Sequence, residues 1–295
     1  MKKLLVFLLI ATLCTSLFAF TSCDEAVVLK AEDMLAHCND SITTDPLQTM
    51  LNIYLDADLY SVAFHNVPGD KVTIDFTQHD RCSVTKRIEN NTLYIEQKSE
   101  PFTVHLNGTL CLVVGVPEGW VGYTLVADVS VGTLCVENSK ASNIDVEIST
   151  GGAVISAENA DQVKLESDTG AISFTGKANL LQADVDTGAV KLFGQADKVI
   201  AHTDTGAIKV DMLATELDLS SNTGSIVFTV GNNKTIKVQN DTGSVRGTID
   251  GVQSHYSILV DVDTGSCNLK DQIGTETNIL EIDVDTGSVN VTFKQ

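Results

Sequence analysis

The chain is poor in aromatic residues, in proline and in positive charge. Aromatic residues make up 5% of its 295 residues, with one tryptophan, and only four residues are proline. So few large side chains suit a slender β-stack better than a wide hydrophobic core. The 19 lysines and arginines are outnumbered by 39 aspartates and glutamates, which gives a formal net charge of −20. This excess argues against nucleic acid or a bare anionic membrane as a partner and leaves cationic partners and divalent ions open.

Cysteine is present without a pattern that indicates a redox or zinc site, because the sequence contains no Cys-x-x-Cys pair. Cys135 and Cys267 fall at inward positions of expected strands, so we expect them to be small buried hydrophobic residues. Cys82 and Cys111 are the candidate disulfide. His202 is expected to lie outward and to be solvated.

The hydrophobic run that is long enough to be a targeting segment lies at the N-terminus. Leu4 to Leu13 follow two lysines and are too few for a membrane span, so residues 1–22 are expected to be a signal peptide. The run ends in Phe20-Thr21-Ser22-Cys23, which resembles a bacterial lipobox with Phe20 in place of the usual leucine. We therefore expect Cys23 to be lipidated and the protein to be an outer-membrane or cell-surface lipoprotein, with the periplasm as the alternative. Residues 23–46 are expected to be a tether or linker.

A short phrase recurs down the second half of the chain. It reads Asp-Thr-Gly followed by alanine or serine, and Asn222-Thr223-Gly224 is a degenerate copy. Successive glycines from Gly151 to Gly287 are 19, 18, 18, 18, 19, 22 and 22 residues apart. A period near 20 residues indicates a solenoid in which each repeat is one coil stacked on the preceding one. The glycines expected at the structural turns are Gly151, Gly170, Gly188, Gly206, Gly224, Gly243, Gly265 and Gly287.

Apolar residues alternate with polar ones on both sides of each phrase. Leu181, Ala183 and Val185 precede one copy, and Val190 and Leu192 follow it. This period of two, rich in β-branched residues, indicates strands with one buried face. The predicted fold class is therefore all-β: a single-stranded parallel β-helix, or solenoid, with coils of about 18–22 residues. In each turn, we expect the aspartate to accept backbone N–H bonds and the glycine to supply a positive φ angle.

Residues 47–125 are rich in predicted strands but lack the regular repeat. Turn signals such as Pro68-Gly69-Asp70 and Pro117-Glu118-Gly119 separate these strands. We expect irregular first coils and a cap here, because an uncovered solenoid end can pair with other chains. Regular coils with Asp-Thr-Gly turns are expected over residues 126–295. Their open C-terminal end makes end-to-end self-association a further expectation.

These features together resemble the bacterial "putative adhesin" family of β-strand-repeat exported proteins, which is common in the Bacteroidetes. The resemblance rests on an opening strand at Met50 to Asp56, the Val-Pro-Glu-Gly of Val116 to Gly119 and the repeated Asp-Val-Asp-Thr-Gly-Ser phrases. It covers residues 47–295. The resemblance implies an exported β-solenoid of largely unknown function and supplies no catalytic residues.

The phrase Val284-Asp285-Thr286-Gly287-Ser288 also matches the catalytic turn of aspartic proteases. In such an enzyme two aspartates must share a proton in one pair. The copies at coil spacing are expected to lie in a line along one edge of the solenoid instead. We therefore do not expect a protease.

A line of aspartates raises the question of calcium. Neighbouring carboxylates about 4.8 Å apart repel each other. Turn N–H groups would offset this repulsion, and Ca²⁺ bound between coils would do the same. We expect no cofactor, with Ca²⁺ as the alternative. The candidate metal ligands are Asp168, Asp184, Asp186, Asp204, Asp241, Asp261, Asp263, Asp283 and Asp285.

The function we expect is that of a non-enzymatic binding module of the cell envelope or surface. Its partner would be an unknown surface glycan or protein, and it would contact the membrane only through its lipid anchor. Trp120 and Tyr123 are the candidate residues for stacking on a sugar. One alternative is a polysaccharide lyase or hydrolase, although the nearly minimal coils leave little material for a groove. The other is an envelope-stress sensor or scaffold.

Overall fold

The protein is described from a computed structural model, which places residues 30–47, 49–100, 110–231 and 233–294. The expected signal peptide, residues 1–22, and the expected lipidation site, Cys23, lie outside these described residues.

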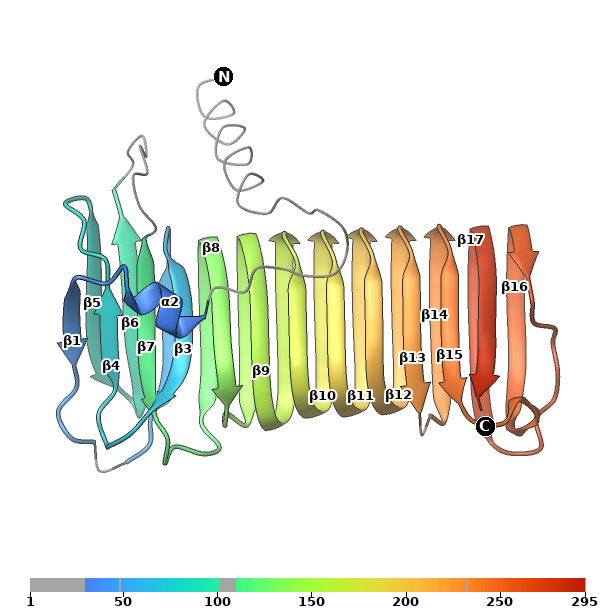
Figure 1. Cartoon of the computed structure of the whole chain (residues 1–295), viewed down its shortest axis with the longest axis horizontal. Helices are drawn as coiled ribbons and strands as arrows, with labels where there is room; N and C mark the ends of the chain where they lie inside the picture. The colour runs from blue at the N-terminus through green and yellow to red at the C-terminus, as the bar shows by residue number, and fades with distance from the viewer. Residues whose placement is uncertain (1–29, 48, 101–109, 232, 295) are drawn as a thin grey trace, which may run out of the picture.

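The described chain forms a long stack of β-coils, a solenoid of about nine turns (Figure 1). Along the regular part, each strand pairs in parallel with the equivalent segment of the neighbouring coil. The predicted all-β solenoid is therefore confirmed. The strands of the regular part are β8 (Thr124–Ser139), β9 (Asn143–Thr169), β10 (Ile172–Thr187), β11 (Val190–Thr205), β12 (Ile208–Thr223), β13 (Ile226–Gly231), β14 (Thr235–Thr242), β15 (Val245–Asp250), β16 (Tyr256–Cys267) and β17 (Asn278–Lys294).

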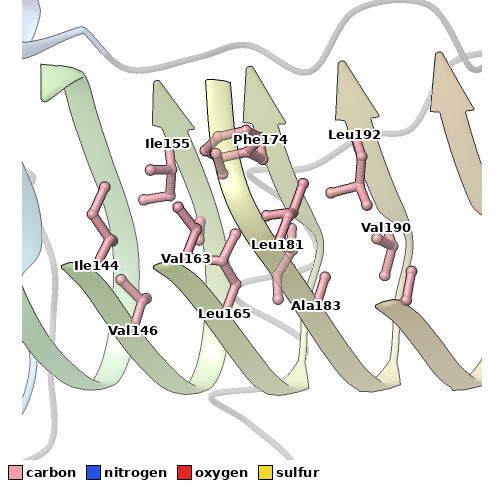
Figure 2. Packing of buried hydrophobic residues seen from close by; sticks show 14 of the residues in the cluster. Ile144, Val146, Ile155, Val163, Leu165, Phe174, Leu181, Ala183, Val190 and Leu192 are labelled. Carbon is pink, nitrogen blue, oxygen red and sulfur yellow. The ribbon is translucent and has the colours of Figure 1, made fainter. Parts of the chain in front are cut away.

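The core lies inside the coils, as columns of equivalent apolar side chains. Leu181 pairs in register with Val163 on one side and Val199 on the other, and all three are fully buried. Phe174 lies between Ile155 and Leu192 in a second column (Figure 2). Burial of such side chains stabilises the fold by about 25 cal/mol per Å² of apolar surface. The period-two pattern of the sequence is thus the direct cause of the columns.

Each regular coil turns twice, once at its Asp-Thr-Gly corner and once at a buried alanine. The alanines of successive coils pair in register, Ala160 with Ala178, Ala178 with Ala196, and Ala196 with Ala214. Two strand segments run between these corners. The outward side chains of a coil therefore form two separate faces, one before and one after each Asp-Thr-Gly corner.

The N-terminal end of the stack is an irregular cap. Its outermost strands pair antiparallel, β1 with β4, β4 with β7, and β5 with β6. Deeper strands join the parallel stack, β2 against β8 and β3 against β8. The elements of the cap are α2 (Ala31–Leu35), β1 (Asp40–Thr43), β2 (Asn52–Ala57), β3 (Ser61–Val67), β4 (Thr73–Phe76), β5 (Cys82–Glu89), β6 (Thr92–Ser99) and β7 (Cys111–Pro117).

Part of the expected tether, residues 23–46, is folded onto this cap. The buried side chains of Ala31 and Met34 in α2 pack on an apolar patch that includes Cys135. Cys135 pairs with Val154 at an outward position of β8, so the inward orientation expected from the sequence is wrong. The thiol is buried because the helix covers it. The alternation along a strand predicts on which side of the strand a residue lies, but not which other segment packs against that side.

The two last coils are stacked in the reverse of their chain order. β17 pairs with β14 and β15 on one side and with β16 on the other, so β16 forms the end of the stack (Figure 1). The expectation that every coil stacks on the preceding one is wrong at this end. In the observed order, the apolar residues of β17 as far as Val289 have a neighbouring coil on both sides.

Candidate functional site

Each Asp-Thr-Gly corner is built on a glycine that other residues cannot replace. The eight predicted turn glycines have φ angles between +141° and +159°. A Cβ on Gly170 would lie 1.3 Å from the carbonyl oxygen of Gly151, and one on Gly188 would lie 1.7 Å from that of Gly170. The N–H of Gly188 donates to the carbonyl of Thr205 in the next coil at 2.9 Å. Corners of neighbouring coils are therefore in direct backbone contact.

The aspartates before these glycines lie in one exposed row, which we call the acidic ridge. Its register follows from the adjacent threonines, which pair from coil to coil. The amide of Asn222 donates to Oδ1 of Asp204 at 2.7 Å. His202 is half-buried and lies 3.2 Å from the same oxygen, so it is not simply solvated. In stack order the ridge consists of Asp168, Asp186, Asp204, Asn222, Asp241, Asp285 and Asp263.

The expected bonds from turn N–H groups to these carboxylates are not formed. Among the described residues, corner N–H groups donate to the carbonyl groups of the neighbouring coil, as Gly206 does to Thr223 and Gly243 to Thr286. The inter-coil ladder continues through the corner and uses the donors that an Asx turn would need. The ridge carboxylates are therefore exposed to solvent, and that of Asp204 is also contacted by Asn222 and His202.

A second acidic row runs beside the ridge, two residues earlier in each coil. Asp184 and Glu166 pair across neighbouring coils, as do Asp283 and Asp261. At the cap, the row continues through residues that sequence reasoning missed, because the Asp-Thr-Gly phrase is absent there. We call the outward surface of the strands that lead into the corners, which includes the ridge and this row, the acidic face. In stack order the members of the row are Glu96, Asp56, Asp128, Glu147, Glu166, Asp184, then His202, Ser220 and Gln239, which interrupt the acidic residues, and then Asp283 and Asp261.

Crowding of charge on the acidic face perturbs its carboxyl groups. Partial burial raises the pKa of Asp283, and the nearby carboxylates of Asp261, Asp285 and Asp263 raise it further. Burial also raises the pKa of Asp128. The face therefore holds its negative charges against mutual repulsion.

Lysines on the acidic face form ion pairs with it. The Lys164 ammonium lies 2.8 Å from Glu166, that of Lys198 lies 3.3 Å from Glu216, and that of Lys237 lies 3.6 Å from Glu281. Exposed pairs of this kind each contribute at most about 1 kcal/mol to stability. Their main effect is local neutralisation.

The arrangement of the candidate metal ligands is linear. Within the ranges that the structure describes, no three histidine, cysteine, aspartate or glutamate side chains lie close enough together to hold a metal ion. Asp263 and Asp285 occupy equivalent corners of adjacent coils, where Thr264 pairs with Thr286. The corners do not face each other as the two aspartates of a protease would.

The two candidate sugar-stacking residues belong to the core. Trp120 is 7% exposed and Tyr123 is 3% exposed. Their rings meet edge to face with centroids 6.3 Å apart, and the Tyr123 hydroxyl is 3.3 Å from that of Ser139. The prediction that they stack on a ligand is wrong, because neither ring offers a free face. The predicted Cys82–Cys111 disulfide is likewise not formed, and both cysteines are free.

The opposite face, formed by outward residues of the strands that leave each corner, has a different character. Lys191, Lys209 and Arg246 share one row, each three residues after its corner glycine. We call this surface the basic face. Sequence reasoning missed it, although the shared offset from the glycine was a usable signal. In stack order the row is Ser173, Lys191, Lys209, Val227, Arg246 and Asn290.

The chain is similar in fold to several solved bacterial structures, of which three are described as putative adhesins or a putative cell adhesion protein. One is a putative adhesin from Bacteroides fragilis, with 14% identity over 87% of this chain and 99% of that chain and a TM-score of 0.38. Another is a putative adhesin from Parabacteroides merdae, with 9% identity over 87% and 95% and a TM-score of 0.42. The third is a putative cell adhesion protein from Clostridium sporogenes, with 11% identity over 86% and 98% and a TM-score of 0.27.

These names agree with the resemblance found in the sequence. At such low identity and TM-score, they carry no argument about what this chain binds. No model of a known protein family matches the chain, and no curated protein matches it. In the part of the chain that the structure describes, no helix is both long and apolar enough to cross a membrane.

Proposed function

We propose that the protein is a non-enzymatic binding module of the cell surface or envelope, which presents the flat faces of its solenoid to a glycan or a protein. The observation that carries this proposal is the register of its outward side chains. Equivalent residues of neighbouring coils pair from β9 through β12, so each outward row repeats at the strand spacing of about 4.8 Å.

A repeating row suits a repeating partner. Each coil adds one weak contact at a fixed distance from the last, and linked contacts combine into high avidity without any single strong site. The solenoid supplies the rigidity for this, because neighbouring coils share a continuous core and a hydrogen-bonded backbone ladder.

Attachment to the outer membrane through a lipid on Cys23 is part of the proposal. It is supported by the lipobox-like Phe20-Thr21-Ser22-Cys23 and the apolar run before it. In a bacterial host, wild-type protein should incorporate a clickable fatty acid and fractionate with membranes. Cys23→Ala should lose both properties, and a variant that still carried the label would contradict the anchor.

The test of the function is a glycan and protein array probed with the mature chain. Runs with calcium and with chelator would show whether Ca²⁺ on the acidic face takes part. We expect specific, saturable binding to at least one surface glycan or protein. Failure to bind any of them, together with turnover of a polysaccharide by the same preparation, would replace the binding module by the enzyme alternative.

A further inference from the structure

The lysine and arginine side chains on the two faces differ in whether they form ion pairs. On the acidic face, Lys164, Lys198 and Lys237 are each within 4 Å of a carboxylate. On the basic face, Lys191 and Lys209 lie side by side in adjacent coils and form no ion pair within the described residues. Like charges at this spacing repel. An anionic ligand bound along the row would relieve this repulsion.

Arg246 extends this row by two further coils. It follows Val227, which follows Lys209 in register, and Arg246 is exposed and also unpaired in the described structure. The three cations therefore span four coils, a length of about 14 Å at the usual strand spacing. A linear ligand that lies along the stack can contact all three.

The surroundings of the cations are polar but mostly uncharged. The next outward row on the same face, two residues later in each coil, carries one carboxylate, Asp211. Phe193 is half-buried in that row, with the Lys209 ammonium 5.8 Å from its ring centroid. Val227, in the row of the cations, is 36% exposed. The remaining members of the row that contains Phe193 and Asp211 are hydroxyl side chains: Thr175, Thr229, Thr248 and Thr292.

We propose that the basic face binds an acidic polysaccharide, laid lengthwise along β10 to β17. Carboxylate or sulfate groups of the chain pair with Lys191, Lys209 and Arg246. Hydroxyl groups of its sugars bond to the threonine row, and their C–H surfaces pack on Phe193 and Val227. The inference rests on the proposed function and adds its ligand class and its face.

The net charge of the whole chain makes this face selective. A protein with 39 acidic and 19 basic residues repels polyanions over most of its surface. Only a ligand that fits along the basic row escapes that repulsion.

The experiment measures binding of the mature chain to polygalacturonate, to dextran sulfate and to neutral dextran. Two double variants are compared, Lys191→Thr with Lys209→Thr on the basic face, and Lys198→Thr with Lys237→Thr on the acidic face. Both remove two strand lysines and change the net charge equally. They differ in the face and in the ion pairs that Lys198 and Lys237 form with Glu216 and Glu281. Each cation at an anionic surface contributes about fivefold to affinity. We therefore expect the first variant to lose roughly twentyfold or more and the second to change less than about threefold.

Further outcomes separate the carboxylate ligand from the sulfate ligand and the inference from the function. Preference for polygalacturonate or for dextran sulfate identifies which anion the face takes, and binding to either should weaken as salt increases. Equal losses in both double variants would show general electrostatic attraction and overturn the inference. So would unchanged binding in the first variant, or binding to neutral dextran alone. A partner found on the array that ignores both double variants would leave the binding module standing and remove the acidic polysaccharide.

Discussion

Replacing Gly188 by alanine tests whether the corners hold the coils together. The added Cβ would lie 1.7 Å from the carbonyl oxygen of Gly170, and the backbone has φ of +152°. That φ alone costs an alanine about 1–3 kcal/mol. Relief of the clash requires the coils of Gly170 and Gly188 to separate, which weakens the corner bonds between them, such as that from Gly170 N–H to the carbonyl of Thr187, at about 1 kcal/mol each. We expect a loss of about 4 kcal/mol or more in the free energy of unfolding.

Two other glycines provide matched controls. Gly69 has φ of +100°, and a Cβ at this residue would have no atom within 4 Å, so Gly69→Ala isolates backbone strain and should cost about 1–3 kcal/mol. Gly119 also has open space around it and no positive φ, so Gly119→Ala should stay within about 0.5 kcal/mol of wild type. Urea unfolding followed by far-ultraviolet circular dichroism gives all three values under the same conditions.

The comparison between Gly188→Ala and Gly69→Ala decides the matter. Both introduce alanine at a positive φ, but only one introduces a contact between coils. If the two variants lost equal stability, close packing of corner on corner would not be what limits these positions to glycine. The same would follow if Gly188→Ala kept the wild-type transition.

Three further perturbations have expected outcomes. Asp283→Asn should raise the melting temperature at pH 7. The pKa of Asp283 is raised in the folded protein, so its ionisation above the ordinary value of 3.8 destabilises the fold, and the gain should vanish below that pH. A gain that persisted in acid would have another cause. Asn222→Asp should remove the hydrogen bond to Asp204 and add a repulsion of about 1 kcal/mol between the two carboxylates, which added salt should reduce. If the melting temperature of this variant did not depend on salt, the ridge would not be a row of interacting charges. Met34→Ala should undock α2 and expose Cys135. Burial raises the pKa of this thiol to about 12 in the wild type, so thiol labelling of the variant at pH 8 should rise well above the wild-type level. Unchanged labelling would mean that the helix is not what protects the thiol.

The parts of the structure that could be predicted from the sequence are those set by local repetition. Alternation around each corner gives the buried columns, and the glycine period gives the stacking of coils. The acidic ridge follows from these two facts, because equivalent positions of stacked coils must lie in a row. The same logic applied to Lys191 and Lys209 would have given the basic face. These lysines lie outside the repeated phrase, at a fixed distance from it, so the phrase alone does not reveal them.

What could not be predicted is how one surface is covered by another. Trp120 and Tyr123 lie where a sugar platform would be plausible by composition, yet they pack on each other inside the cap. Cys135 faces outward from its strand and is buried only because α2 lies over it. Both outcomes depend on contacts between segments far apart in the chain. No period of the local sequence records such contacts.

The reversed order of the last two coils has a cause that can be traced to one difference between them. β17 continues past its corner as a full second strand, which pairs with all of β15 (Val245–Asp250). β16 ends at Cys267, just after its corner, and is only half a coil. Stacked in chain order, this half coil would leave the backbone groups of β15 without a ladder partner at the edge of the core, and each buried group left unpaired costs about 1–3 kcal/mol. At the end of the stack, a missing second strand opens only one edge of β17, and Asn268 bonds to Val289 and Val291 on that edge. The sequence contains this difference, since Val289, Val291 and Phe293 continue the alternation beyond the corner of β17, whereas the alternation after the corner of β16 ends at Leu269 and Asp271 stands at the next inward position.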